Sequence, residues 1–183
     1  MMDNNTTLVL GGARSGKSGN AEALALNLKL DLIYVATGEA RDDEMRKRIE
    51  HHKMQRGPLW KTIEEPLYLS SAIINHSLPE NVLLIDCLTL WLSNLLEKNM
   101  DIDNEVSYLI DALNKASGAI IFVANEVGQG IVPLNPLARE FRDHAGRLNQ
   151  QIAANVANVY VITAGLPLPL KENNQLLTRK FIK

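Results

Sequence analysis

The residues best suited to chemistry stand in one run near the N-terminus, Gly11-Gly12-Ala13-Arg14-Ser15-Gly16-Lys17-Ser18. This run matches G-x-x-x-x-G-K-[ST], the pattern of the phosphate-binding loop known as the P-loop. An apolar run precedes it and the alanine- and leucine-rich run 21–28 follows it, so the context is strand, loop and helix. Every residue of the run is therefore predicted to bind a nucleoside triphosphate. Lys17 would reach the β- and γ-phosphates, and the Ser18 hydroxyl would ligate Mg²⁺.

A second candidate ligand ends the apolar run 82–85. Asp86 follows this run in the pattern of a Walker B strand, whose terminal carboxylate holds Mg²⁺ directly or through water. The alternative is a strand-end Asp that caps a helix starting near Leu88. The P-loop favours the metal role. Cys87, the next residue, is predicted to be a small buried filler rather than a reactive thiol.

Basic residues concentrate between Arg46 and Lys61, on a segment whose start, Asp42-Asp43-Glu44, is typical of a helix N-terminus. A solvated helix face explains such a charge run. Because the chain carries a P-loop, the segment is also a candidate second clamp for phosphate.

Two adjacent histidines lie in this basic segment, and helical geometry separates them. His52 falls on the same stripe as Met45 and Ile49, which faces the body, whereas His51 is rotated about 100° away. Arginines one turn before and one turn after His52 would bind phosphate and keep the imidazole neutral, as a nucleophile must be. His52 is therefore a candidate catalytic nucleophile.

A glycine- and proline-punctuated loop, 125–133, follows the fourth predicted strand and carries Glu126. A loop at the carboxyl edge of a sheet that carries an acid suits an acceptor-binding role. Glu126 is a candidate catalytic residue, because a carboxylate there could orient an acceptor hydroxyl or take its proton. A long helix is predicted to follow, from about Pro136 to Asn155.

Composition restricts the class of protein. The chain has 183 residues, 46% hydrophobic and 22% charged, with a formal net charge of -2. This balance does not suggest non-specific nucleic-acid binding. No apolar run approaches the ~20 residues of a membrane span. A single cysteine and no signal pattern lead us to expect a cytoplasmic enzyme.

Continuous apolar runs predict the fold. They alternate with helical stretches and predict an α/β protein with a doubly wound, mostly parallel sheet, in the manner of P-loop NTPases. We expect one domain over residues 1–183, with a peripheral tail at 171–183. The predicted strands cover residues 7–10, 31–36, 82–85, 119–123 and 159–162.

Taken together, these motifs resemble the bifunctional adenosylcobinamide kinase/adenosylcobinamide-phosphate guanylyltransferase family of cobalamin biosynthesis. The match covers nearly the whole chain. Beyond the P-loop, the matching pieces are Tyr34-Val35-Ala36-Thr37, Asp42-Asp43-Glu44-Met45, Arg48-Ile49-Glu50-His51-His52-Lys53, Trp60-Lys61-Thr62-Ile63-Glu64, Asn125-Glu126-Val127-Gly128, Leu137-Ala138-Arg139, Phe141-Arg142-Asp143 and Gly146-Arg147-Leu148-Asn149-Gln150.

The resemblance implies two reactions. ATP or GTP phosphorylates the aminopropanol hydroxyl of adenosylcobinamide; GTP then places GMP on a histidine, and adenosylcobinamide phosphate collects it to give adenosylcobinamide-GDP. The family pattern R-I-x-x-H-[RK] selects His52. The resemblance also implies a homotrimer. The family often has Glu where this chain has Asp86, which keeps the carboxylate with a shorter reach. Beyond the P-loop, the implied nucleotide contacts are Ala36, Thr37, Gly38, Lys53, Met54, Gln55, Arg56, Glu64 and Asp86.

Two other functions are alternatives to this one. A P-loop kinase of another small alcohol or of a nucleotide would use the same loop and leave His52 idle. A regulatory GTPase would need a guanine-reading N-K-x-D and a D-x-x-G, and the chain has Asn114-Lys115-Ala116-Ser117 and Asp86-Cys87-Leu88-Thr89 instead.

Overall fold

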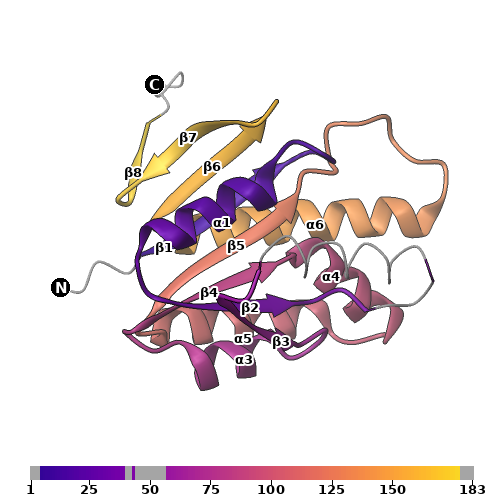
Figure 1. Cartoon of the computed structure of the whole chain (residues 1–183). Helices are drawn as coiled ribbons and strands as arrows, with labels where there is room; N and C mark the ends of the chain where they lie inside the picture. The colour runs from indigo at the N-terminus through magenta and orange to yellow at the C-terminus, as the bar shows by residue number, and fades with distance from the viewer. Residues whose placement is uncertain (1–4, 40–42, 44–56, 178–183) are drawn as a thin grey trace.

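The computed structural model describes residues 5–39, 43 and 57–177. Within them, one eight-stranded sheet runs in the order β3-β2-β4-β5-β1-β6-β7-β8 and is flanked by helices (Figure 1). The strands are β1 Thr6–Gly11, β2 Asp31–Ala36, β3 Trp60–Glu64, β4 Asn81–Asp86, β5 Ala119–Asn125, β6 Asn158–Thr163, β7 Leu166–Glu172 and β8 Gln175–Leu176. The helices are α1 Lys17–Asn27, α3 Leu69–His76, α4 Leu88–Glu97, α5 Ile102–Lys115 and α6 Pro136–Asn155.

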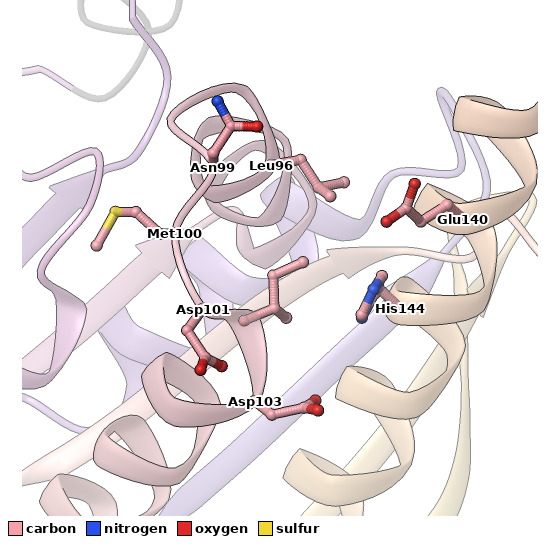
Figure 2. Close-up of a pocket in the computed structure, with 8 residues that line it drawn as sticks. Leu96, Asn99, Met100, Asp101, Asp103, Glu140 and His144 are labelled. Carbon is pink, nitrogen blue, oxygen red and sulfur yellow. The ribbon is translucent and has the colours of Figure 1, made fainter.

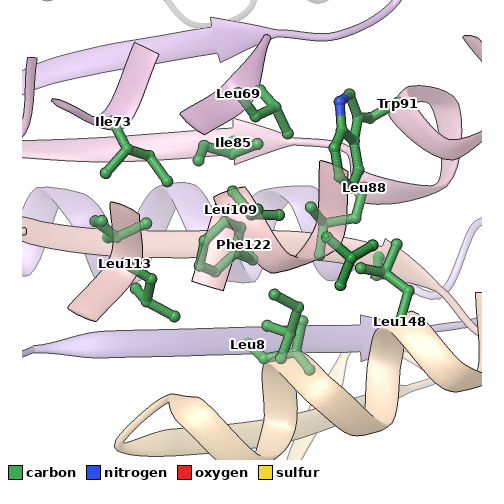
Figure 3. Packing of buried hydrophobic residues seen from close by; sticks show 14 of the residues in the cluster. Leu8, Leu69, Ile73, Ile85, Leu88, Trp91, Leu109, Leu113, Phe122 and Leu148 are labelled. Atoms are coloured by element: carbon green, nitrogen blue, oxygen red, sulfur yellow. The ribbon is translucent and has the colours of Figure 1, made fainter. Parts of the chain in front are cut away.

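The middle positions of the central strands are apolar on both faces, as suits a sheet that is covered on both faces. Along β4, Leu83 and Ile85 pack into the core that lies under α3, α4, α5 and α6. Val82 and Leu84 point to the other face, where α1 packs with Ala21 and Ala25. Figure 3 shows the larger of the two cores, in which side chains from the strands meet those of the helices. The sheet is parallel from β3 to β6, which confirms the predicted fold class.

Local signals set the helix boundaries. The Asn135 side chain accepts a 2.9 Å hydrogen bond from the Leu137 N–H, and Pro136 stands at the first helical position of α6. The predicted helix from Pro136 to Asn155 is confirmed. In the same way, the Asp101 carboxylate caps α5 by accepting from the Asn104 N–H at 3.1 Å. No helix within the described residues has the length and apolarity to cross a membrane.

The sequence predicted the five central parallel strands but missed the strands at the two edges. β3 has three polar residues among its five, and β7 contains Pro167 and Pro169, which cannot donate to a ladder and normally argue against a strand. β3 stands at one edge of the sheet, and β8 pairs only with Lys171 and Glu172, so the part of β7 that contains the prolines has a neighbouring strand on one side only. A two-residue turn joins β6 to β7, with φ of 52° at Ala164 and 80° at Gly165, as a tight hairpin requires.

The start of the predicted tail contributes to the fold. Lys171 lies in β7, and its Nζ donates to the carbonyls of Ala153 at 3.1 Å, Ala154 at 3.2 Å and Val156 at 2.6 Å. These oxygens end α6, where the helix itself supplies no donors. Lys171 therefore fastens the end of α6 to the β6–β7 hairpin.

The carboxyl ends of β2 and β4 are tied together by Thr37. Its buried Oγ1 donates to the Cys87 carbonyl and accepts from the Cys87 N–H, both at 2.8 Å. The Asn94 amide donates to the carbonyls of Thr37 at 2.8 Å and Pro66 at 2.9 Å, which adds α4 and the chain after β3. This buried group fixes the edge of the sheet where ligands of such folds gather.

Replacing Thr37 by Val keeps the shape of the side chain but leaves the buried N–H of Cys87 without its partner, while the Cys87 carbonyl keeps the bond from the Trp91 N–H at 3.1 Å. We expect the free energy of unfolding to fall by about 1–3 kcal/mol. Urea unfolding followed by circular dichroism measures it. Thr37→Ser keeps the hydroxyl and is the control; an equal loss in both variants would assign the effect to the methyl group instead.

Candidate functional site

The strand register brings the predicted site residues to one edge of the sheet. Glu64, Ala36 and Asp86 pair side by side across β3, β2 and β4. Gly11, where the P-loop begins, pairs with Asn125 at the end of β5. Because β5 lies between β1 and β4, the P-loop strand and the Asp86 strand are about 10 Å apart. A ligand shared by the two would lie over the end of β5.

The P-loop ends in a helix N-terminus that no side chain caps. Gly16 is the N-cap residue, its φ of 92° favours glycine, and no acidic residue stands in the first turn of α1. The N–H groups of a first turn have no acceptor within their helix, and they carry the positive end of the helix dipole. This arrangement fits a phosphate group.

The interior of the loop fits the same ligand. The Lys17 Nζ folds back onto the Gly12 carbonyl at 3.1 Å, which the Ser15 N–H also approaches at 3.3 Å. The Ser15 hydroxyl is buried and finds no partner among the described residues. A Cβ on Gly11 would lie 2.8 Å from the Ile162 carbonyl, so the entry to the loop requires glycine. An ammonium group and an unpaired hydroxyl thus stand ready for a polar ligand.

Asp86 does not cap the neighbouring helix. α4 begins at Leu88, with Cys87 as its N-cap residue and no capping bond from a side chain. Capping of α4 therefore does not explain Asp86, whose half-buried side chain lies at the edge of the sheet. Burial, reinforced by the Asp86 charge, raises the pKa of the Cys87 thiol to about 11. Cys87 is thus a protonated, buried filler, as the sequence predicted.

Glu126 lies directly beside the P-loop. Its N–H donates to the Gly11 carbonyl at 3.0 Å, and its Oε1 accepts from the Gly128 N–H at 2.6 Å. One carboxylate oxygen therefore shapes the loop that carries it. The Arg139 guanidinium fastens the far end of this loop, donating to the carbonyls of Pro133 at 3.0 Å and Leu134 at 2.6 Å.

The remaining predicted nucleotide contacts fall into two groups, those that lie within the described residues and those that do not. Gly38 follows β2 at the same edge, whereas Thr37 is wholly buried and its hydroxyl is engaged with Cys87. Glu64 is exposed at the end of β3. The candidate nucleophile and the nucleotide contacts predicted directly after it lie outside the described residues. They are His52, Lys53, Met54, Gln55 and Arg56.

Two features of the site were missed by sequence reasoning. The Ala164–Gly165 turn contacts the P-loop, since the Gly165 N–H donates to the Ser15 carbonyl at 2.8 Å. The Thr89 hydroxyl accepts from the Asn125 N–H at 2.7 Å and so ties β5 to α4. Gly165, which stands between two apolar runs, is the sequence signal for a turn. No sequence signal indicates that this turn contacts the P-loop.

A separate cavity of about 380 Å³ lies between the α4–α5 connection and α6 (Figure 2). Asp101, Asp103, Glu140 and His144 line it, and none of the predicted site residues does. Three carboxylates, two from the start of α5 and one from α6, would repel a polyphosphate. The P-loop edge, and not this cavity, is therefore the candidate nucleotide site.

Comparisons with known proteins match the chain to one family. Residues 7–170 match the family model described as cobinamide kinase / cobinamide phosphate guanyltransferase. A bifunctional adenosylcobalamin biosynthesis protein, CobP of Pseudomonas aeruginosa, is 46% identical over 166 residues, covering 90% of this chain and 96% of its own length. The bifunctional adenosylcobalamin biosynthesis protein CobU of Escherichia coli is 41% identical over 179 residues, covering 90% of this chain and 98% of its own.

A solved structure supports the fold alone. The flagellar accessory protein FlaH of Methanocaldococcus jannaschii superposes with a TM-score of 0.52 at 14% identity, covering 93% of this chain and 79% of that chain. At this identity the likeness concerns the sheet and its flanking helices.

Proposed function

The chain belongs to the cobinamide kinase / cobinamide phosphate guanyltransferase family, and from this membership we propose how one site serves both reactions. It is a transferase of cobalamin biosynthesis that phosphorylates cobinamide and then adds a guanylyl group. We propose that adenosylcobinamide, adenosylcobinamide phosphate, GTP and ATP are its substrates, and that a GMP-histidine forms on His52.

One observation supports the nucleotide site above all others. The N-terminus of α1 presents uncapped N–H groups at the same sheet edge as Lys17 and Asp86. Such an N-terminus attracts phosphate whatever the base of the nucleotide is. Both reactions consume a triphosphate, so a single loop can serve both.

In the kinase step, the acceptor hydroxyl oxygen attacks the γ-phosphorus and the bond to the β-phosphate oxygen breaks, which releases the nucleoside diphosphate. Lys17 would stabilise the charge that develops on the β- and γ-phosphates. Glu126 would orient the hydroxyl and accept its proton. Ser18 and Asp86 would hold Mg²⁺, which supplies further charge neutralisation when bound.

In the guanylyl step, a neutral His52 nitrogen would attack the α-phosphorus of GTP, and pyrophosphate would leave. A phosphate oxygen of adenosylcobinamide phosphate would then attack the same phosphorus and free the histidine. What supports His52 is its position in the motif Arg48-Ile49-Glu50-His51-His52-Lys53 and the arginines predicted on either side of it. Splitting the transfer replaces one difficult displacement by two easier ones.

We further propose a homotrimer in the cytoplasm. The trimer rests on the resemblance to the family, whose members share an active site between neighbours. The cytoplasm rests on the kind of enzyme, and Cys87, a buried free thiol, is compatible with a reducing compartment.

Lys17→Ala removes the cation at the β- and γ-phosphates. Because this charge stabilises both transition states, we expect kinase and guanylyltransferase rates to fall together by at least about 100-fold. Steady-state assays of each reaction on the purified variant measure this. A variant that keeps either activity near the parent rate would place that reaction at another site.

Glu126→Gln keeps the hydrogen bond to the Gly128 N–H but removes the base. We expect phosphorylation of adenosylcobinamide to slow by about 100-fold while guanylylation of the enzyme changes little. Comparing the two half-reactions measures the difference. If both fall equally, Glu126 shapes the loop around the shared nucleotide and does not act on the acceptor.

His52→Ala is expected to abolish covalent attachment of GMP and to leave transfer of the γ-phosphoryl group to adenosylcobinamide largely intact. The test is incubation with α-labelled GTP, denaturation, and mapping of the labelled peptide, whose label should be acid-labile.

His51→Ala is the matched control, since it removes the neighbouring imidazole and should keep the label. GMP found on His51, or still formed by His52→Ala, would overturn the assignment of the nucleophile.

A further inference from the structure

The turn between β6 and β7 holds the P-loop from the side. This turn lies beside the start of α1 (Figure 1), and its Gly165 N–H donates to the Ser15 carbonyl at 2.8 Å. Gly16 and Gly165 approach backbone to backbone, since a Cβ on Gly16 would lie 3.2 Å from the Gly165 Cα. The position of the loop therefore depends on a hairpin far away in the sequence.

The Asn20 side chain joins the two. Its Nδ2 donates to the Gly16 carbonyl at 2.9 Å and to the Gly165 carbonyl at 3.2 Å. One amide group thus connects the first turn of α1, the P-loop and the β6–β7 turn.

These bonds control where the loop points its donors. In a trans peptide unit the carbonyl and the following N–H point in opposite directions. Fixing the Ser15 carbonyl therefore directs the Gly16 N–H away from the hairpin. The Gly16 carbonyl accepts the helical bond from the Asn20 N–H at 3.1 Å as well as the bond from the Asn20 side chain, so it points along α1 and the Lys17 N–H points out of the N-terminal end of the helix.

We propose that Asn20 is a positioning residue for nucleotide binding, because it locks the P-loop against the Ala164–Gly165 turn with these N–H groups directed at the phosphates. The inference rests on the proposed function only in that the chain binds a nucleoside triphosphate. Asn20 need not contact the nucleotide; it acts through the peptide units of the loop.

Asn20→Leu tests this without adding charge, since Leu has nearly the same size and cannot donate. We expect the Kd for GTP, measured by calorimetry without cobinamide, to rise about tenfold. The nucleotide KM of both reactions should rise by the same factor, while kcat at saturating nucleotide changes far less. Asn20→Ala should act in the same direction and serves if the Leu variant does not fold.

Asn155→Leu is the matched control. Asn155 makes the same kind of bond in α6, from its Nδ2 to a carbonyl four residues earlier, Gln151, at 2.9 Å. It lies far from the P-loop, at the last residue of α6. We expect its loss to leave the Kd for GTP unchanged.

A second pair of variants tests the hairpin itself. Gly165→Asn tolerates the positive φ and its Cβ enters open space, so it should bind GTP like the parent. Gly165→Val cannot adopt that φ readily and should weaken binding as Asn20→Leu does. Parent affinity in Asn20→Leu, or an equal loss in Asn155→Leu, would overturn the proposal. A parent that binds GTP but does not act on cobinamide would overturn the proposed function alone.

Discussion

A phosphate-binding loop must keep its own N–H groups unpaired, so something outside it has to hold its shape. In this chain the loop Gly12–Lys17 leaves the first turn of α1 without a side-chain cap, which is costly until an anion arrives. The constraint explains the surroundings. Glycine at position 11 admits the close Ile162 carbonyl, the Gly165 N–H donates to the Ser15 carbonyl, and the Lys17 Nζ donates to the Gly12 carbonyl.

The sheet provides the rigidity that this arrangement needs. β1 lies between two fully paired parallel strands, and both faces of the central strands are covered by packed helices. A loop anchored at the end of such a strand moves little unless the core moves. At the same edge, Thr37 and Asn94 use buried hydrogen bonds to fix the chain after β2, β3 and β4.

Two carboxylates at this edge are in different situations. Asp86 is not engaged in capping α4, whereas Glu126 already gives one oxygen to the N–H of Gly128. A carboxylate with one oxygen fixed has its other oxygen restricted in direction, which suits a group that must orient one hydroxyl. The cavity between the α4–α5 connection and α6 is lined by three carboxylates, which would repel a polyphosphate, whereas the uncapped N-terminus of α1 favours one.

The sequence by itself determined the nucleotide loop, the five central strands, α6 and the buried state of Cys87, because each depends on a local pattern of glycines, apolar runs or capping residues. It also predicted that Asp86 and Glu126 lie at one edge of the sheet, since the carboxyl ends of parallel strands share that edge. Only the tertiary structure decided that Thr37 is a buried tie, that the chain segment with Pro167 and Pro169 forms strand β7, and that Asn20 and Gly165 contact the P-loop. These roles come from residues distant in the chain whose hydrogen bonds form once the sheet is assembled, and no local pattern encodes such a pairing.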